Sequence, residues 1–506
     1  MMPFRNEPFS PYNGSAIDRV RKILNREYDL ILAERKVTTS QKITSYSPSH
    51  PEIIIGTVGA GDEGITEQAI QTAATSFNEW KRVSASARAN ILLRAASLLR
   101  RRRDEFSAWM VWEAGKTWTE ADGDTAEAID FLEFYARSML ELSQPHPLTP
   151  HPGERNELYY IPLGVGAIIT PWNFPLAIMA GMTASAIVAG NTVVLKPASP
   201  TVVLTMQFLQ LLQEAGLPAG VVNCVPGDGP VVGEYLVKHP DIRFISFTGS
   251  RDVGIRIQQL AAHTAPGQRW LKRVVSEMGG KDAIVVDKKA DLDLAIHSIV
   301  GSAFHFAGQK CSACSRAIVH ADVYDTVLQG VVEQTKKLKV GPSEDPTVHV
   351  GPVITPLAKE KILAYMEIGK KEGVLQIGGH AIEGGGNFLQ PTVFSDVDPT
   401  ARIAQEEIFG PVVAFHRASS FDHALTIAND TEYGLTGAVI SNDRTHLEEA
   451  REVFHVGNLY FNRRCTGALV GVHPFGGFNM SGTDSKAGGK DYLLHFTQAK
   501  LVSEAF

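Results

Sequence analysis

The chain lacks several features that would place it in other classes of protein. It has only 4 Cys among 506 residues, too few for a disulfide scaffold, which indicates a reducing compartment. Its 48 Lys and Arg against 55 Asp and Glu give a net charge of −7, whereas a nucleic-acid binder needs a clustered positive face. No apolar run reaches the roughly 18 residues of a membrane-spanning helix, so no membrane partner is expected.

What the chain does contain is typical of a globular enzyme. Disorder is disfavoured, because 44% of the residues are hydrophobic and 20% are charged. At roughly 150 residues per domain, the length predicts two or three domains with ample core. The N-terminus lacks the charged segment followed by an apolar segment that marks a signal peptide. We therefore expect a cytoplasmic protein.

Strands and helices alternate in the middle of the chain. Short β-rich runs are predicted at Gly164–Thr170, Thr192–Leu195, Val221–Val225, Arg243–Phe247 and Leu271–Ser276. Helical patterns at 175–189, 201–215, 230–239 and 251–263 alternate with them. This alternation predicts an α/β fold with a doubly wound parallel sheet, whose ligands bind at the carboxyl ends of the strands.

Two flanking regions complete the expected architecture. Before the alternating region, helices are predicted at 64–80, 87–116 and 126–143, with one β-like piece at 52–58. Beyond it, strands at 283–286, 315–320, 412–417 and 437–440 indicate a second α/β half. A Pro- and His-containing stretch near residue 145 indicates a loop or extended arm, and the sequence ERNELYYIPLG that follows predicts a strand.

Unusual residues follow the predicted strands, where a ligand is expected. Lys196 would place an ammonium ion at this edge, although a solvated strand end explains it equally well. Ser250 lies at a strand-to-helix turn, where helix N-terminal amides can face a diphosphate. The run Gly59–Gly64 formally matches GxGxxG, but no second strand or acid follows at the required spacing. A turn that caps a helix is the better interpretation of that run.

Cys311 and Cys314 form a CxxC motif that the local sequence leaves open. Zinc would need further ligands, and Cys224 and Cys465 are isolated in the sequence, so no metal site is expected. A nucleophile, a buried structural thiol and a redox pair remain equally compatible with the motif. Lys310 beside Cys311 would favour the thiolate of a nucleophile.

Seven motifs in order resemble the aldehyde dehydrogenase superfamily, from near residue 40 to the end: PWNFP, KPA, FTGS, EMGGK, GQKC, EEIFGPV and HPFGG. Within it, GQKCSACSR at 308–316, HVGNLYFNRRCTGALVG at 455–471 and FGGFNMSGTDSKAGG at 475–489 resemble the 1-pyrroline-5-carboxylate dehydrogenase branch. The resemblance implies NAD-dependent oxidation of L-glutamate γ-semialdehyde, the hydrolysed form of 1-pyrroline-5-carboxylate, to L-glutamate. This reaction belongs to proline and arginine degradation.

The resemblance also implies three catalytic residues. Cys311 would be the nucleophile that forms a thiohemiacetal with the aldehyde and then a thioester. The Asn173 side-chain amide and the Cys311 backbone N–H would hold the oxyanion. Glu277 would be the general base that activates water, and its glycine neighbours would let the carboxylate move. The alternative for Glu277 is a solvated strand or helix end.

Five residues match the cofactor site of the family, and a sixth position, Ser199, departs from it. Lys196 and Glu407 would hold the two riboses, and the turn at Gly249 and Ser250 the diphosphate, while Phe409 would lie beside the nicotinamide ribose. Many NAD-preferring relatives carry Glu three residues after the lysine, where this chain has Ser199. Loss of that carboxylate removes repulsion of a 2′-phosphate, so we expect NAD as the main cofactor with measurable use of NADP.

Five residues match the substrate site of the branch. Ser312 and the backbone amides of Gly467 and Ala468 would bind the α-carboxylate of the semialdehyde. Phe174 and Phe475 would sandwich its aliphatic part. The alternatives are that the serine satisfies its own loop and that both rings belong to the core.

Three other functions compete with this one. A different semialdehyde or an aliphatic aldehyde is the alternative within the family. A thiol hydrolase or acyltransferase would need an oriented His base, and His305 and His320 are near Cys311 in sequence. A noncatalytic scaffold on the same fold is the third.

The resemblance predicts three parts. Residues 1–145 and 164–278 would form the NAD-binding domain, 279–480 the catalytic domain, and 146–163 with 481–506 the oligomerisation arm of the family. We therefore expect a homo-oligomer that acts on a small molecule. The sequence shows no fused proline dehydrogenase domain, so that enzyme would be a separate, transient partner.

Overall fold

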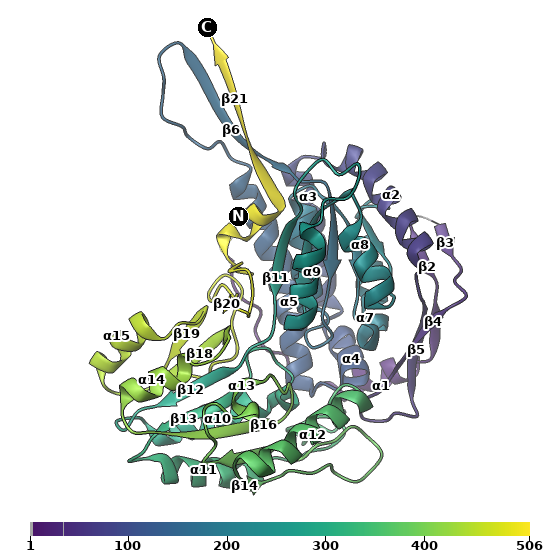
Figure 1. Cartoon of the computed structure of the whole chain (residues 1–506). Helices are drawn as coiled ribbons and strands as arrows, with labels where there is room; N and C mark the ends of the chain where they lie inside the picture. The colour runs from purple at the N-terminus through teal and green to yellow at the C-terminus, as the bar shows by residue number, and fades with distance from the viewer. Residues whose placement is uncertain (1–3, 34) are drawn as a thin grey trace.

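The computed structural model describes residues 4–33 and 35–506, which form two α/β bodies and a projecting β-arm (Figure 1). The first body is built on a parallel sheet in the order β11-β10-β7-β8-β9. Its strands are β7 (Val165–Ile169), β8 (Thr192–Lys196), β9 (Val222–Cys224), β10 (Ile242–Thr248) and β11 (Arg273–Glu277). The chain winds from β7 out to β9 and then crosses to β10 and β11 on the other side. This confirms the predicted doubly wound sheet, with its switch point between β7 and β10.

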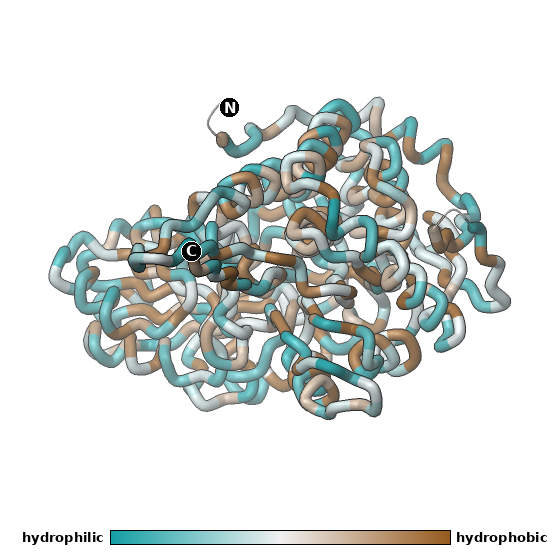
Figure 2. The backbone as a smooth tube through the Cα atoms, turned by 90° about the horizontal axis from the view of Figure 1, so that it is seen from above, coloured by the Kyte–Doolittle hydropathy of each residue, from teal (hydrophilic) through white to brown (hydrophobic). Residues whose placement is uncertain are grey.

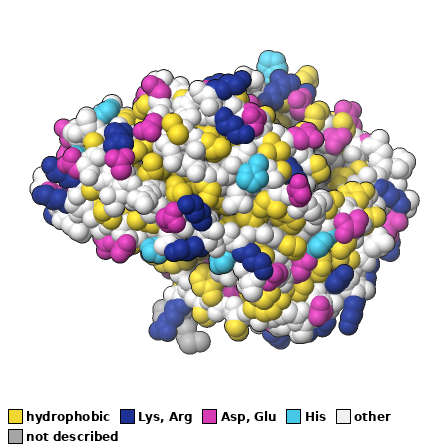
Figure 3. Space-filling model, turned by 90° about the horizontal axis from the view of Figure 1, so that it is seen from below, with side chains coloured by type: hydrophobic (Ala, Val, Ile, Leu, Met, Phe, Trp, Pro, Cys, Tyr) yellow, Lys and Arg dark blue, Asp and Glu magenta, His cyan; other side chains and the backbone are white. Residues whose placement is uncertain are grey.

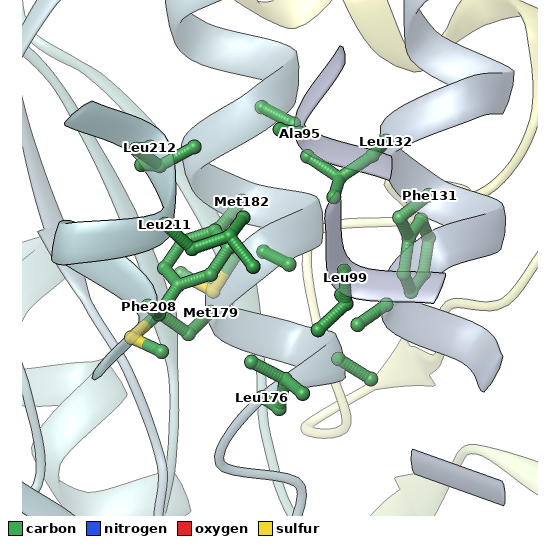
Figure 4. Close-up of a cluster of buried hydrophobic side chains, with 14 of the residues drawn as sticks. Ala95, Leu99, Phe131, Leu132, Leu176, Met179, Met182, Phe208, Leu211 and Leu212 are labelled. Atoms are coloured by element: carbon green, nitrogen blue, oxygen red, sulfur yellow. The ribbon is translucent and has the colours of Figure 1, made fainter. Parts of the chain in front are cut away.

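Helices cover both faces of this sheet. One face carries α3 (Ala85–Arg101), α5 (Trp118–Leu142), α6 (Ala177–Val188) and α7 (Val202–Glu214). Leu99, Phe131, Met182 and Phe208 from these helices lie together in a buried cluster (Figure 4). The other face carries α2 (Glu63–Trp80), α8 (Glu234–Lys238) and α9 (Arg251–Ala262).

The N-terminal region differs from expectation in its helices and in its strands: α1 (Gly14–Arg21) was not predicted, and α5 begins at Trp118 and not at residue 126. The predicted helix at 87–116 is two helices, because the backbone breaks at Arg102 before α4 (Arg103–Ala114). Apart from β5 (Ile54–Gly59), the strands of this region were missed: β1 (Arg26–Tyr28), β2 (Leu30–Leu32), β3 (Arg35–Val37) and β4 (Lys42–Tyr46). They are only three to five residues long, so they give little apolar periodicity, although Leu30 and Leu32 of β2 are buried. The turn at 59–64 is a helix cap, as expected, with Asp62 accepting from the Ile65 N–H at 2.8 Å.

The second body contains a seven-stranded sheet in the order β14-β15-β16-β13-β12-β18-β19, parallel except for β14 at one edge. Its strands are β12 (Asp282–Val286), β13 (Cys314–His320), β14 (Val374–Ile377), β15 (Thr392–Ser395), β16 (Val412–Ala418), β18 (Thr436–Ile440) and β19 (Asn458–Phe461). The helices on it are α10 (Leu292–Phe304), α11 (Tyr324–Lys336), α12 (Pro356–Glu372), α14 (Phe421–Asn429) and α15 (Arg444–Val453). The four predicted strands are confirmed.

Shorter elements connect these layers. They are α1 (Gly14–Arg21), α13 (Arg402–Gln405), β17 (Tyr433–Gly434), β20 (Phe478–Asn479), η1 (Ser199–Thr201), η2 (Gly229–Gly233), η3 (His305–Gly308) and η4 (Lys490–Phe496). Within the described ranges, no helix is both long enough and apolar enough to cross a membrane.

The arm is an antiparallel pair of β6 (Glu154–Pro162) and β21 (Thr497–Ala505), with the C-terminus near its tip (Figure 1). The predicted strand at 154–164 is confirmed. Figure 2 looks down onto the arm and shows apolar segments running through both bodies beneath it. The arm also carries apolar side chains in solvent, with Tyr159 46% and Leu501 60% exposed.

Candidate active site

Segments from both bodies converge on the loop that carries Cys311. Asn173 follows β7, and its side-chain amide donates to the carbonyl oxygen of Gln309 at 3.2 Å. Glu277 ends β11, and the chain after it returns to the same loop, since a Cβ on Gly280 would lie 2.3 Å from the Cys311 carbonyl oxygen. The structure thus brings together the thiol loop, the amide and the carboxyl group that the sequence singled out.

The loop before Cys311 has an unusual backbone that its neighbours hold in place. Phe306 and Ala307 have φ of 54° and 51°, a left-handed conformation uncommon for residues with side chains. Gly308 follows with φ of 67°, and a Cβ there would lie 2.2 Å from a backbone carbonyl oxygen of the loop before β16. The buried Gln309 side chain donates to the Phe306 carbonyl at 3.2 Å and accepts a backbone N–H at 2.9 Å. These contacts fix the position of the thiol.

Electrostatics favour the neutral thiol of Cys311 in this state. The side chain is half-buried and unpaired as a disulfide. Burial raises its pKa well above the ordinary value, and the carboxyl groups of Asp282, Glu407 and Glu277 raise it further. Lys310 does not offset them, because its ammonium ion pairs with a carboxylate on α5 at 2.9 Å. The expectation that Lys310 favours the thiolate is therefore wrong.

Glu277 has the surroundings of a base with a raised pKa. Burial raises the pKa of its carboxyl group to about 8, against the hydrogen bond that Ser485 donates to Oε1 at 2.8 Å. Oε2 has no hydrogen-bond partner in the described part of the chain. Gly476 and Gly482 leave room beside the carboxyl group. A Cβ on Gly476 would lie 2.9 Å from Oε1, and a Cβ on Gly482 would lie 3.4 Å from it. One oxygen is anchored and the other is available.

The end of β8 carries a buried lysine whose ammonium group makes few hydrogen bonds to the protein. Lys196 is 9% exposed, and its Nζ makes one long contact, 3.5 Å, to the carbonyl oxygen of Pro197. Burial lowers the pKa of its ammonium. Three residues on, Ser199 begins η1 and is half-buried. A buried ammonium ion with one weak partner suits a ligand that supplies hydroxyl oxygens, such as a ribose.

The turn after β10 fits a diphosphate. Ser250 precedes the first residue of α9, is exposed, and its hydroxyl caps no backbone N–H of that helix. Gly249 donates its N–H to the Glu277 carbonyl oxygen at 3.1 Å, which joins this turn to the end of β11. A Cβ on Gly249 would lie 2.6 Å from the Phe247 ring. The helix N-terminus is therefore open to an anion.

Glu407 and Phe409 lie on the opposite side, before β16. Glu407 accepts from the Gly280 N–H at 3.0 Å, and burial raises the pKa of its carboxyl. Phe409 has φ of 59° and meets Trp172 edge-on, with ring centroids 5.5 Å apart. Together with Lys196, these residues fit a dinucleotide that spans the two bodies.

One contact joins the thiol loop to the segment that carries two of the predicted substrate residues. Ser312 follows the thiol, and its carbonyl oxygen is 3.4 Å from Sγ of Cys465, which joins the thiol loop to the loop of Gly467 and Ala468. Phe475 is half-buried and exchanges two backbone hydrogen bonds of 2.8 Å with Ala487. Phe174 is half-buried beside Asn173. The roles of these five residues in substrate binding stay predictions.

A buried charge network behind Phe174 was missed. Lys116 is completely buried, its ammonium lies 3.9 Å from the Phe174 ring centroid, and it pairs with Asp124 at 2.8 Å. On the same helix, α5, Glu120 pairs with Lys310. Glu127 lies on the same helix; it is half-buried, and its pKa is raised to about 8. The spacing of Glu120, Asp124 and Glu127 places all three on one face of α5. That spacing was visible in the sequence, but acidic helix faces usually meet solvent.

The CxxC motif does not act as a pair in this structure. Cys314 begins β13 and is buried, and its thiol donates to the carbonyl oxygen of Arg316 at 3.5 Å. All four cysteines are free thiols. Among the described residues, no group of three His, Cys, Asp or Glu side chains is arranged to hold a metal ion. Cys314 has the surroundings of a structural thiol.

Comparisons with known proteins agree with this geometry. Residues 36–502 match the model of the aldehyde dehydrogenase family. A 1-pyrroline-5-carboxylate dehydrogenase of Geobacillus thermodenitrificans is 60% identical over 514 aligned positions that cover both chains completely. The crystal structure of 1-pyrroline-5-carboxylate dehydrogenase from Thermus with bound NAD superposes with a TM-score of 0.98 at 49% identity, again over both whole chains. Proline utilization A from Bdellovibrio bacteriovorus matches at 43% identity and TM-score 0.98, over 99% of this chain and 53% of its own.

Proposed function

The chain belongs to the aldehyde dehydrogenase family, and from this premise we propose that it oxidises L-glutamate γ-semialdehyde to L-glutamate with NAD, in proline and arginine degradation. The semialdehyde is the open form of 1-pyrroline-5-carboxylate. The observation that carries the proposal is the convergence of Cys311, Asn173 and Glu277 beside residues that fit a dinucleotide. The relatives named above support the substrate.

Cys311 begins the reaction. Its thiol first loses a proton to water, and the sulfur then adds to the aldehyde carbon, which places the negative charge on the oxygen of a thiohemiacetal. The Asn173 amide nitrogen carries two hydrogens and donates one to the Gln309 carbonyl. The other hydrogen can donate to the new oxyanion, and so can the Cys311 N–H. Because Asn173 is anchored on the thiol loop itself, the donor and the sulfur keep their relative positions.

Glu277 completes the reaction. NAD held by the cofactor residues would serve as the hydride acceptor, and loss of hydride from the thiohemiacetal carbon would leave a thioester on Cys311. The free Oε2 of Glu277 takes a proton from water, and the resulting hydroxide adds to the thioester carbon. Collapse of that adduct releases the carboxylate product and the Cys311 thiolate.

Substrate recognition rests on five residues. Ser312 and the N–H groups of Gly467 and Ala468 bind the α-carboxylate, and Phe174 and Phe475 enclose the aliphatic chain. Lys196, Ser199, Gly249, Ser250, Glu407 and Phe409 bind the cofactor.

The test is the appearance of absorbance at 340 nm when semialdehyde and NAD are added to the enzyme. A panel with succinic semialdehyde and aliphatic aldehydes identifies the substrate. More than about tenfold preference for succinic semialdehyde would overturn the substrate assignment. A thiol hydrolase or acyltransferase would turn over substrate without producing any reduced cofactor.

The same proposal covers assembly and organisation. Residues 1–145 and 164–278 serve as the NAD-binding domain, 279–480 as the catalytic domain, and 146–163 with 481–506 as the oligomerisation arm. The exposed Tyr159 and Leu501 support a homo-oligomer, because a second subunit would cover them. The free thiols support a reducing compartment such as the cytoplasm, and a proline dehydrogenase would be a transient partner. On the face in Figure 3, charges of both signs are interspersed.

A further inference from the structure

Arg463 lies at the base of the loop that contains Gly467 and Ala468, and it bonds to that loop's backbone. Its Nη2 donates to the carbonyl oxygen of Thr466 at 3.0 Å and to that of Gly467 at 2.9 Å. The guanidinium group also lies 4.4 Å from the ring centroid of Tyr460, on β19. Tyr460 on β19 thus positions the planar guanidinium group, which in turn fixes two successive carbonyl groups by hydrogen bonds.

These two bonds determine where the loop's N–H groups point. In a trans peptide unit the carbonyl and the N–H lie on opposite sides of the chain, and no described peptide bond is cis. The Thr466 carbonyl shares its unit with the Gly467 N–H, and the Gly467 carbonyl shares its unit with the Ala468 N–H. Because both carbonyls face Arg463, both N–H groups point away from it.

The two N–H groups form a concave donor site. Gly467 has φ of 80°, and a left-handed residue in such a position turns successive N–H groups to one side, as in anion-binding nests. Neither the Gly467 nor the Ala468 N–H donates to any residue that the structure describes. A bound carboxylate would therefore replace water and not a protein partner.

A second contact closes the loop beyond this point. The Leu469 N–H donates to Nδ1 of His473 at 3.2 Å, and the His473 N–H donates to the Leu469 carbonyl at 2.8 Å. Nη1 of Arg463 lies 3.2 Å from the other ring nitrogen of His473. The loop is thus fixed on both sides of the two free N–H groups.

We propose that Arg463 is a positioning residue for substrate specificity: it orders the backbone so that the Gly467 and Ala468 N–H groups face the substrate's carboxylate, without touching the substrate itself. The inference rests on the proposed function, in which these amides bind that carboxylate. Pre-ordered donors lower the entropy cost of binding the charged substrate, whereas an uncharged aldehyde gains nothing from them.

The experiment compares Arg463→Met with a matched control, Arg464→Met, which removes the same charge one position away. Arg464 bonds to neither carbonyl, and its Nη1 lies 3.5 Å from Nδ1 of His305. KM and kcat are measured with glutamate semialdehyde and with pentanal, which has the same chain length but no charged groups. We expect Arg463→Met to raise KM for the semialdehyde about tenfold or more, with kcat and the pentanal constants little changed. Arg463→Lys, which keeps a donor, should restore part of the loss.

Two results would overturn the inference. One is a semialdehyde KM within about twofold of the wild type in Arg463→Met. The other is an equal loss with both substrates, which would indicate general damage to the fold. Wild-type preference for the semialdehyde over pentanal tests the proposed function separately. If the wild type prefers the semialdehyde and Arg463→Met is unaffected, the inference about Arg463 is wrong while the proposed function stands.

Discussion

Ser485 donates a 2.8 Å hydrogen bond to Oε1 of Glu277, although the two residues are 208 positions apart in the sequence. The bond favours the carboxylate form, while burial favours the protonated form and prevails, so the pKa of Glu277 is raised to about 8. At neutral pH most Glu277 side chains are therefore protonated before the cofactor and substrate bind. This balance makes the hydrolytic step sensitive to pH.

Thioester hydrolysis is expected to depend on the Glu277 carboxylate. Below pH about 8 its rate should fall with falling pH, approaching tenfold per unit, because only the deprotonated group can accept a proton from water. The measurement is the single-turnover rate of product release as a function of pH. Ser485→Ala removes the bond that favours the carboxylate, so its profile should shift to higher pH. A profile that is flat between about pH 6 and 8 would show that Glu277 is not the base.

Replacement of the two CxxC cysteines should have unequal effects. Cys311→Ala removes the nucleophile and should lower kcat by about 10³-fold or more. Cys314→Ala removes a buried thiol beside Cys465 and should lower stability modestly while most activity remains. Mass spectrometry during turnover should find the acyl group on the wild type and on Cys314→Ala. An acyl adduct on Cys311→Ala would contradict the assignment.

Ser199→Glu should sharpen the preference for NAD. The new carboxylate would lie three residues after Lys196, at the start of η1, where it can bind ribose hydroxyls and repel a 2′-phosphate. The ratio of kcat/KM for NADP to that for NAD should fall about tenfold or more. Ser199→Ala serves as the control, because it adds no charge. An unchanged ratio in Ser199→Glu would show that Ser199 does not face the ribose.

Leu501→Asp should weaken the assembly of subunits. Leu501 is 60% exposed on β21, and a second subunit that covers it would have to bury the new charge. Lys500→Asp places the same residue on the opposite face of the strand. Light scattering after gel filtration should show smaller particles for Leu501→Asp than for Lys500→Asp. Equal masses for both variants and the wild type would exclude Leu501 from the interface.

The sequence predicted the elements whose pattern is local. Strands and helices that alternate over residues 164–277 are buried on one or both faces, and their periodicity reveals them. The strands β1 to β4 were missed because strands of three to five residues are too short to show such a pattern. The helix at 87–116 was predicted unbroken, since nothing in the local composition marks the change of direction at Arg102.

The chemistry of the site divides in the same way. Motif order predicted Cys311, Glu277 and Asn173 as the catalytic residues, because each lies at a strand end or loop with a characteristic sequence. Adjacency in sequence misled in the case of Lys310, whose ammonium ion turns to Glu120. The raised pKa values of Cys311 and Glu277 depend on burial and on carboxyl groups brought from distant segments, and so do the contacts of Arg463. Residue identity fixes which reactions are possible, whereas desolvation and through-space charge, which exist only after folding, decide the protonation state of each group.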